Sequence, residues 1–349
     1  MRVWGPGCPS RGLITLKPLH TWGHSRGRAD IVTGMKAIAF NSPGDPEVFE
    51  VMELPDPEVG PGEVLIRVQA TAVSPTDTMR RAGLRPSKDD GPFVVGMDAA
   101  GVIEAIDESA DTDLTVGDKV MAFLVPSGAH GGYAQRVAVR ADSVTRMPEG
   151  TSFAEASTVP MNGLTAQLAL DTLDLPAGAT LAVTGAAGTL GGYVVQLAKD
   201  RGLTVIADAS KDDDDLVQGF GADIVKLRGE GFAEAVRGKF PKGVDGIVDA
   251  AVQVDEIVPA AKDGAKIITI RGDKGERDRG VTLVPIWVVE YDGRRDKLDE
   301  LRAKVEDGTL TLRVADVVSM DQATEAHRRL EAGGVRGRIV IELGDLPWA

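Results

Sequence analysis

The sequence predicts an α/β protein with two parts, a β-rich part and a doubly wound parallel sheet of the Rossmann kind. Three observations lead to this prediction. From residue 35 to about residue 159, short strand patterns are separated by Pro, Gly and Asp. From residue 160 to about residue 292, apolar runs alternate with helical patterns. A glycine-rich turn, VTGAAGTLGG at residues 183–192, stands between a strand and a helix of that second part.

The strand-like runs of the first part are short and are bounded by turn residues. They are MKAIAF, EVLIRVQATAVS, FVVGMDAAGVIEAI, DKVMAFLV and GGYAQRVAV. Runs of this length with turn signals between them predict a small β-barrel or sandwich.

The second part begins with a helical stretch and then alternates between the two kinds of element. In chain order we expect the helix MNGLTAQLALDTL, the strand TLAVT, the helix TLGGYVVQLAKDRG, the strand LTVIADAS, the helix DDDLVQGFG and the strand ADIVKL. GVDGIVDAA and AKIITIRG have the length of buried parallel strands. Two helices then end near Gly308 and Gly333, and RGRIVIEL is a closing strand. The predicted domains are therefore 160–292 for the Rossmann sheet and 35–159, completed by 293–349, for the β-rich part.

The glycine-rich turn favours a dinucleotide site. Such a turn leaves the first amides of the following helix unpaired, with the positive end of the helix dipole behind them. Small residues allow a pyrophosphate to approach the backbone closely. The spacing is G-x-x-G-x-x-G, from Gly185 through Gly188 to Gly191, and the flanking strand, helix and second strand supply the context that this pattern requires. We expect the pyrophosphate on Ala187, Gly188, Thr189 and Leu190.

The choice between NAD and NADP depends on the residues after the second strand, VIADASKDDDD. Asp208 lies about twenty residues after Gly188, as the NAD pattern requires. Ser210 and Lys211 follow it and are suited to the 2′-phosphate of NADP, although the four aspartates after them would repel that phosphate if they faced it. Those acids also suit the start of a solvated helix. The pattern favours NADP(H) over NAD(H).

Composition excludes several other classes of function. The formal net charge of −14 argues against nucleic-acid binding, and no apolar run approaches the length of a membrane span. Cys8 is the only cysteine, so no intrachain disulfide forms, and we expect a cytoplasmic protein. Residues 1–34 hold five Lys or Arg and one acid, without strand or helix periodicity, and predict a disordered extension. An over-called start codon before Met35 and an organelle transit peptide are the alternatives.

Several matches in the right order resemble the medium-chain dehydrogenase/reductase superfamily, and within it the zinc-independent quinone oxidoreductase branch. They are VSPTDTMRRAG, VVGMDAAGVIEAI, VGDKVMAF, GGYAQRVAV, MNGLTAQLAL, GAAGTLGGYVVQLAK and EAHRRLEAGGVRGRIVIEL. The resemblance runs from residue 35 to about residue 343. It implies a GroES-like β-barrel as the catalytic domain beside the Rossmann domain, and a homodimer.

The resemblance also implies a reaction, reduction of a quinone or of an α,β-unsaturated carbonyl by NADPH. After Met35 the sequence has no cysteine and two histidines, His130 and His327, so we expect no zinc and assign no metal ligand. Without a metal, hydrogen bonds must polarise the carbonyl. A catalytically weak nucleotide-binding or sensing protein, and an NAD-linked alcohol dehydrogenase, are the alternatives.

Site residues are carried over from the resemblance by position. Ser74 stands where the branch usually has Asn beside the nicotinamide, and with Asp77 and Thr165 it forms the expected catalytic set. Asp77 is also read as the cap of the following helix, Asn162 as pocket lining and Tyr133 as a possible proton donor. Both histidines are read as surface or helix residues. The remaining expected cofactor contacts are Ser210 and Lys211, the strand ends Ala250, Ala251, Val252, Thr269, Ile270, Arg271 and Gly272, and the loop Pro285, Ile286 and Trp287, where Trp287 alternatively packs a dimer interface.

Overall fold

The structure is a computed structural model, and it describes residues 34–344. The predicted extension over residues 1–34, including Cys8, lies outside the described residues except for Gly34. Within residues 34–344 the chain forms two seven-stranded sheets and a smaller three-stranded one. The predicted α/β class, with a GroES-like part and a Rossmann part, is confirmed.

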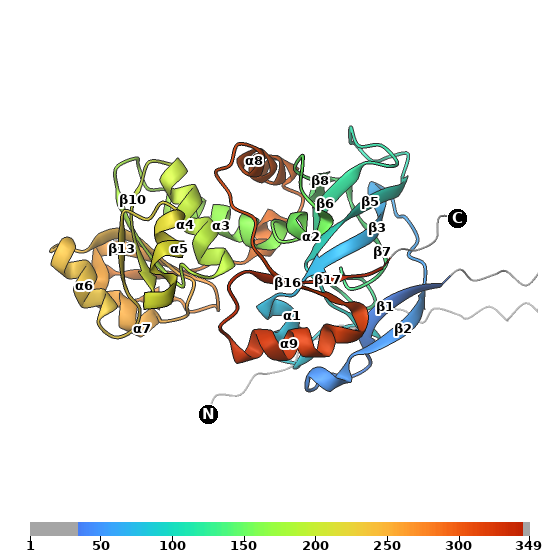
Figure 1. Cartoon of the computed structure of the whole chain (residues 1–349), viewed down its shortest axis with the longest axis horizontal. Helices are drawn as coiled ribbons and strands as arrows, with labels where there is room; N and C mark the ends of the chain where they lie inside the picture. Colours follow the sequence, from blue (N-terminus) through green and yellow to red (C-terminus); the bar gives the residue numbers. More distant parts are fainter. Residues whose placement is uncertain (1–33, 345–349) are drawn as a thin grey trace, which may run out of the picture. The chain divides into compact units, whose positions relative to one another are not determined.

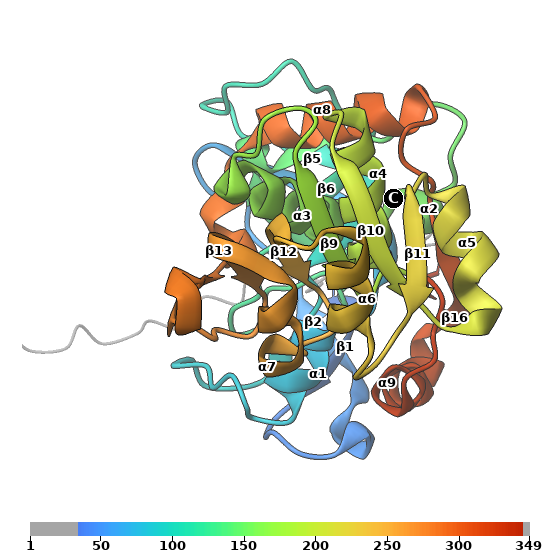
Figure 2. The same ribbon diagram turned by 90° about the vertical axis from the view of Figure 1, so that its left-hand side faces the viewer.

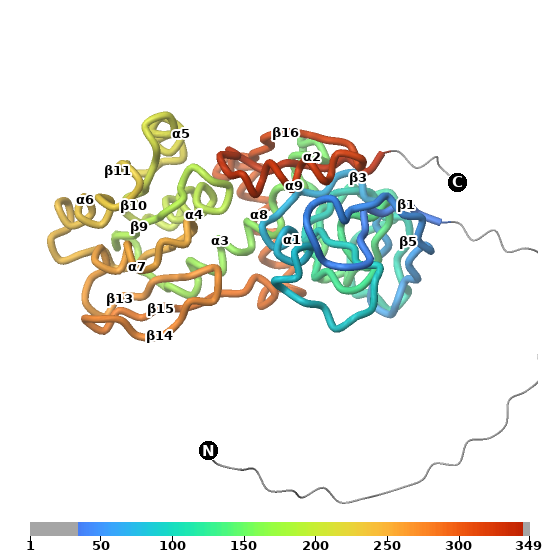
Figure 3. The backbone as a smooth tube through the Cα atoms, turned by 90° about the horizontal axis from the view of Figure 1, so that it is seen from below, coloured from blue at the N-terminus to red at the C-terminus, as the bar shows by residue number. Residues whose placement is uncertain are grey.

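The Rossmann sheet has the strand order β11-β10-β9-β12-β13-β15-β14. Figure 2 shows this order from β11 to β13. β9 lies between β10 and β12, so the strand order reverses at β9, and a ligand crevice forms at the carboxyl ends of the strands there. Figure 3 shows β11 and β14 at opposite edges. The strands are β9 (Thr180–Thr184), β10 (Thr204–Ala209), β11 (Ile224–Leu227), β12 (Val244–Asp249), β13 (Ala261–Thr269), β15 (Thr282–Pro285) and the short antiparallel β14 (Gly275–Glu276).

Helices cover this sheet because each presents an apolar face to it. In α4 (Thr189–Asp200), for example, Tyr193, Val194, Leu197 and Ala198 are buried in the core. The others are α5 (Asp214–Gly219), α6 (Phe232–Lys239) and α7 (Val254–Ile257). Of these, α6 and α7 were not predicted, although Phe232, Ala233 and Val236 form the buried face of α6.

The GroES-like part combines both ends of the described chain. β17 (Arg338–Glu342) pairs with β3 (Glu63–Ala72), so a C-terminal strand enters the sheet of the first part, as Figure 1 shows. The sheet order is β16-β17-β3-β5-β6-β8, with β7 also on β3. Its other strands are β5 (Asp98–Ile106), β6 (Lys119–Phe123), β7 (Arg136–Arg140), β8 (Val144–Arg146) and β16 (Val314–Ser319); β1 (Gly34–Phe40), β2 (Glu50–Pro55) and β4 (Phe93–Val94) form the small sheet.

The helix α3 (Pro160–Leu173) connects the two parts. It contacts α4 and β13 on the Rossmann side and β5 and β6 on the other, and nearly all of its side chains are buried. A helix that is apolar on every side is expected where both faces are covered. The remaining helices are α1 (Pro75–Arg81), α2 (Phe153–Ala156), α8 (Arg295–Glu306) and α9 (Ala323–Ala332).

Candidate active site

The glycine-rich turn joins β9 to α4 and has the geometry of a phosphate-binding turn. Gly185 has φ +66°, a left-handed conformation that favours glycine. A Cβ on Gly191 would lie 2.3 Å from the Gly185 carbonyl oxygen, so only glycine allows the helix to start this close to the strand. No side chain caps α4. The first amides of the helix are therefore available to an anion.

Two buried carboxylates hold the backbone around this turn. The Asp208 carboxylate accepts a hydrogen bond from the Ala186 amide at 3.1 Å, and Asp249 accepts one from the Thr184 hydroxyl at 2.6 Å. Burial raises the pKa of both carboxyls. Asp208 is 2% exposed and does not line the pocket. Its spacing suggested a ribose contact, but Asp208 lies outside the pocket wall, with Oδ1 on the Ala186 amide and Oδ2 without a partner in the described part of the chain.

The predicted 2′-phosphate residues lie beyond the end of β10, around a partly buried ion pair. The Ser210 hydroxyl donates to Asp213 Oδ2 at 2.6 Å, and Arg336 contacts both oxygens of Asp213 at 2.6 and 2.7 Å. Lys211 is exposed. Asp213 is 6% exposed, so it is not one of a row of solvated acids as the sequence suggested. The Asp213 carboxylate accepts hydrogen bonds from the Ser210 hydroxyl and the Arg336 guanidinium, which would otherwise be free to bind a phosphate.

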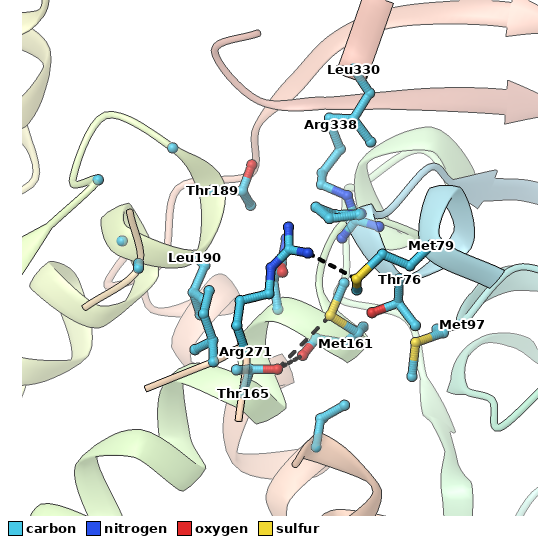
Figure 4. A pocket seen from close by; sticks show the side chains of 18 of the residues that line it. Thr76, Met79, Met97, Met161, Thr165, Thr189, Leu190, Arg271, Leu330 and Arg338 are labelled. Carbon is cyan, nitrogen blue, oxygen red and sulfur yellow. Dashed lines mark hydrogen bonds between the residues drawn. The ribbon is translucent and has the colours of Figure 1, made fainter. Parts of the chain in front are cut away.

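A pocket of about 360 Å³ lies between the glycine-rich turn and α1, and brings most of the predicted residues together. Figure 4 shows Thr189, Leu190 and Arg271 on one side of it and Thr76, Met79 and Met97 on the other. The predicted residues in its wall are Thr165, Gly185, Gly188, Thr189, Leu190, Gly191, Ala250, Val252, Ile270, Arg271, Ile286 and Trp287. Those not in its wall are Ser74, Asp77, Ala187, Ser210, Lys211, Ala251, Thr269, Gly272 and Pro285.

Ser74 and Asp77 form a capping box at the start of α1. The Asp77 carboxylate accepts from the Ser74 amide and hydroxyl, both at 2.8 Å, and from the Gly96 amide at 3.0 Å. Both side chains are fully buried, and burial raises the pKa of Asp77 to about 6. Ser74, not Asp77, is the N-cap residue. The pair lies behind the pocket wall, where it holds Thr76 and Met97 in place.

The wall contains three neutral polar side chains outside the glycine-rich turn, those of Thr165, Asn162 and Thr76. The Thr165 hydroxyl donates to the Met161 carbonyl at 2.7 Å, so it can only accept a further hydrogen bond. The Asn162 amide and the Thr76 hydroxyl form no hydrogen bond within residues 34–344, and Figure 4 shows the Thr76 hydroxyl directed into the pocket. Thr76 was not predicted. It is one residue from the capping box that the resemblance selected.

Two buried polar atoms at the pocket wall have no partner in the described part of the chain. They are Thr189 Oγ1, at the start of α4, and Arg338 Nη1. Arg338 is 4% exposed, and its other nitrogens donate to Asp98 Oδ2 at 2.7 Å and to the Ala72 and Val73 carbonyls. Buried polar atoms are normally satisfied, so both are suited to meet a polar ligand. These groups and the glycine-rich turn fit a dinucleotide.

An unusual backbone conformation at Val252 and a hydrogen bond from Arg313 lie near the glycine-rich turn and its pocket. Val252 has φ +59°, which is unusual for a β-branched residue and is typical of ligand-contact loops. Arg313 donates to the Ala187 carbonyl at 2.8 Å and so links the C-terminal segment to the turn. Arg313 and Arg338 were missed from the sequence. A charge inside the apolar strand RGRIVIEL was the available signal for Arg338.

Tyr133 and His327 form a buried pair away from the pocket. The Tyr133 hydroxyl lies 3.0 Å from His327 Nε2, and both side chains are 0% exposed. His327 is therefore a buried residue of helix α9. The prediction of a helix residue is correct, and the prediction of a surface residue is wrong. Burial lowers the pKa of His327 to about 3 and raises that of Tyr133. His130 Nε2 contacts the Ala138 carbonyl at 2.8 Å.

The described part of the chain offers neither a metal-binding cluster nor a membrane-spanning helix. Within residues 34–344, no three or more His, Cys, Asp or Glu side chains are grouped so that they could hold a metal ion. In the same part of the chain, every helix is too short or too polar to cross a membrane.

Comparison with known proteins identifies relatives over most of the chain. The NADPH-dependent alkenal/one oxidoreductase of Arabidopsis thaliana is 29% identical over 90% of this chain and 81% of its own length. The quinone oxidoreductase of Sus scrofa is 27% identical over 88% of this chain and 98% of its own. The Pikromycin polyketide synthase component PikAII of Streptomyces venezuelae is 30% identical over 86% of this chain, which spans only 8% of that protein.

A solved structure has the same fold as this chain. A probable oxidoreductase from Mycobacterium abscessus is 30% identical, with a TM-score of 0.77 over 89% of this chain and all of its own. The fold and pocket thus define a dinucleotide-dependent oxidoreductase. Residues 60–149 match the alcohol dehydrogenase GroES-like domain, and residues 220–341 match the zinc-binding dehydrogenase family. The chain belongs to the medium-chain dehydrogenase/reductase superfamily, in its quinone oxidoreductase-like branch.

Proposed function

We propose that this protein reduces a quinone or an α,β-unsaturated carbonyl with NADPH and without zinc. The pocket carries the proposal, because one wall is a dinucleotide-type glycine turn and the rest of its lining includes the neutral hydrogen-bonding groups of Thr76, Asn162 and Thr165 as well as three arginines. The printed activities of the plant and pig relatives are of this kind. Hydrogen-bonding groups of this kind suit an acceptor that is already electron-poor.

The bound dinucleotide would supply a hydride, which an enone accepts at its β-carbon while its carbonyl oxygen gains negative charge. The chain's own residues bind the cofactor and orient the acceptor. Thr189 and the first amides of α4 would hold the pyrophosphate, and Arg338 Nη1 would donate to it. Asn162 and Thr76 would donate to the carbonyl oxygen, and Thr165 can accept from a carboxamide. The α-carbon then takes a proton from water.

Ser74 and Asp77 act in this proposal as positioning residues. Because both are buried behind the wall, they would orient Thr76 and Met97 rather than contact the acceptor. In this proposal Thr76, two residues after Ser74, makes the contact with the acceptor that was expected of Ser74.

NADPH oxidation with a panel of quinones, enones and simple ketones tests the proposal. We expect turnover with electron-poor acceptors, none with alcohols and NAD⁺, and no loss after dialysis against a chelator. Metal content is measured on the same sample. Saturable NADPH binding without turnover on any acceptor would favour the sensing protein, and a zinc-dependent alcohol activity would favour the dehydrogenase.

The proposed preference for NADP(H) rests on the exposed Lys211, because Asp213 already accepts hydrogen bonds from Ser210 and Arg336. Lys211→Ala is expected to raise the dissociation constant of NADPH about tenfold, since a charged hydrogen bond to the 2′-phosphate is lost. NADH binding has no such contact and should change little. Cofactor fluorescence titration measures both constants. Lys239→Ala, which removes another exposed lysine of the same domain, is the control. An unchanged NADPH constant would contradict the assignment.

We further propose a cytoplasmic homodimer that does not bind nucleic acid. The family resemblance supports the dimer, and the net charge of −14 supports the last point. Sedimentation analysis of the full chain tests the dimer.

A further inference from the structure

The pocket continues outward into a vestibule of about 850 Å³. The two share Met79, Arg85, Val252, Arg271 and Trp287, so an acceptor that enters the pocket through the vestibule passes these residues. The only charged side chains that line the vestibule are Arg85 and Arg271. Arg85 lies in the loop after α1, and Arg271 follows β13, so the two charges come from different parts of the fold.

Neither arginine has an acidic partner within residues 34–344. The Arg85 guanidinium stacks over the Trp287 ring at 4.8 Å, and Arg271 Nη1 contacts Met79 Sδ at 2.8 Å. Figure 4 shows Arg271 reaching into the pocket towards Met79. By contrast, Arg336 and Arg338 each contact a carboxylate. The absence of a carboxylate here is notable in a chain with 53 acidic residues and 39 Lys and Arg.

The two arginines are held together against their mutual repulsion. Partial burial and the charges of Arg80 and Arg271 lower the pKa of Arg85, so these cations are close enough to interact. Like charges gathered without a counter-ion are unfavourable, and an anion between them relieves the repulsion. Guanidinium groups are particularly suited to carboxylate and phosphate groups.

The rest of the vestibule is apolar. Leu84 is 74% exposed, Val252 46% and Trp287 38%, which is unusual exposure for large apolar side chains. A ligand that covers them therefore has an apolar body. Together with the two arginines, this describes an amphiphilic anion.

We propose that Arg85 and Arg271 bind an anionic group, a carboxylate in the first instance, at the far end of an apolar acceptor whose reactive double bond lies in the pocket. This inference rests on the proposed reductase function and names its substrate class. The cofactor's own phosphates are the other possible source of an anion at these arginines, and the experiment separates the two.

The test uses two straight-chain methyl enones that differ only at the end remote from the enone. One ends in a carboxylate, and the other ends in the methyl ester of that carboxylate. The readout is the ratio of kcat/KM for the acid to kcat/KM for the ester, with NADPH saturating. We expect the wild type to prefer the acid, and the preference to weaken with added salt. Arg85→Gln should lower the ratio about tenfold, the equivalent of one charged hydrogen bond. Lys274→Gln, which removes an exposed lysine outside the vestibule, should leave the ratio unchanged.

The outcomes are distinguishable. If the ester is reduced as well as the acid and Arg85→Gln leaves the ratio unchanged, the anion site is wrong while the reductase function stands. If Arg85→Gln instead raises the KM for NADPH and not the ratio, the arginine serves the cofactor. If neither enone is reduced, the proposed function fails, and calorimetric binding of the acid to wild type and Arg85→Gln, each with NADP⁺ bound, still decides the anion site.

Discussion

Replacing Arg338 with methionine is expected to lower the free energy of unfolding by about 3–5 kcal/mol. The reason is Asp98, which is 0% exposed and accepts from Arg338 Nη2 at 2.7 Å and from the Met161 amide at 2.7 Å. Burial raises the pKa of Asp98 and the charge of Arg338 opposes that rise. Without the guanidinium, a buried carboxylate is left without its counter-charge. The ion pair also joins β17, β5 and α3, so its loss disturbs the pocket wall.

Chemical denaturation of the purified variant measures this effect. The second variant Asp98→Asn with Arg338→Met removes both charges and should recover a large part of the loss, since breaking a buried pair costs more than replacing it. Lys304→Gln breaks a solvent-exposed pair with Asp200 and should change the free energy by less than about 1 kcal/mol. A loss for Arg338→Met as small as that of Lys304→Gln would show that the buried pair is not important for stability.

Gly191→Ala is expected to weaken NADPH binding at least about tenfold. The added Cβ would lie 2.3 Å from the Gly185 carbonyl oxygen and 2.8 Å from the Ala186 Cα, both backbone atoms that cannot move aside without opening the turn. An opened turn no longer directs the first amides of α4 at one point, which removes the preorganised phosphate site. The measurement is a fluorescence titration with NADPH, after circular dichroism has shown that the variant folds.

The matched control is Gly219→Ala, at the end of α5 in the same sheet domain. A Cβ at Gly219 meets nothing within 4 Å, so this variant should bind NADPH as the wild type does. If Gly191→Ala does not fold, Gly188→Ala offers a milder change, since its Cβ would lie 3.2 Å from the Gly185 oxygen. Wild-type NADPH affinity in a folded Gly191→Ala protein would contradict the proposed pyrophosphate seat.

The sequence was sufficient for the regular elements around the turn. The predicted strand TLAVT is β9, and the helix that follows is α4 as expected. Other predictions were correct only in part. The run FVVGMDAAGVIEAI is two strands, β4 and β5, because Gly96 with φ +103° interrupts it. Helix α6 was missed because it has only eight residues and lies between two glycine-containing loops.

At the candidate site, the sequence pattern alone did not predict the contacts of two residues, Asp208 and Ser74. Asp208 has the spacing of a ribose ligand, yet its carboxylate is engaged by the Ala186 amide. Ser74 has the position of a catalytic residue, yet it caps α1. In both cases the sequence gives the residue type and its spacing. Neither of these tells which way the side chain points.

The sequence by itself determined the α/β class, the place of the glycine turn and the shortage of zinc ligands after Met35, because periodicity, glycine content and residue counts are local or compositional. Only the tertiary structure decided which polar groups are engaged and which face the pocket. Asp213 pairs with Arg336 across 123 positions of the chain, and Asp98 with Arg338 across 240. The juxtaposition of Arg85 and Arg271 is equally remote in sequence, since it depends on how the loop after α1 meets the end of β13. Such contacts leave no periodic signal, because the packing of distant elements creates them.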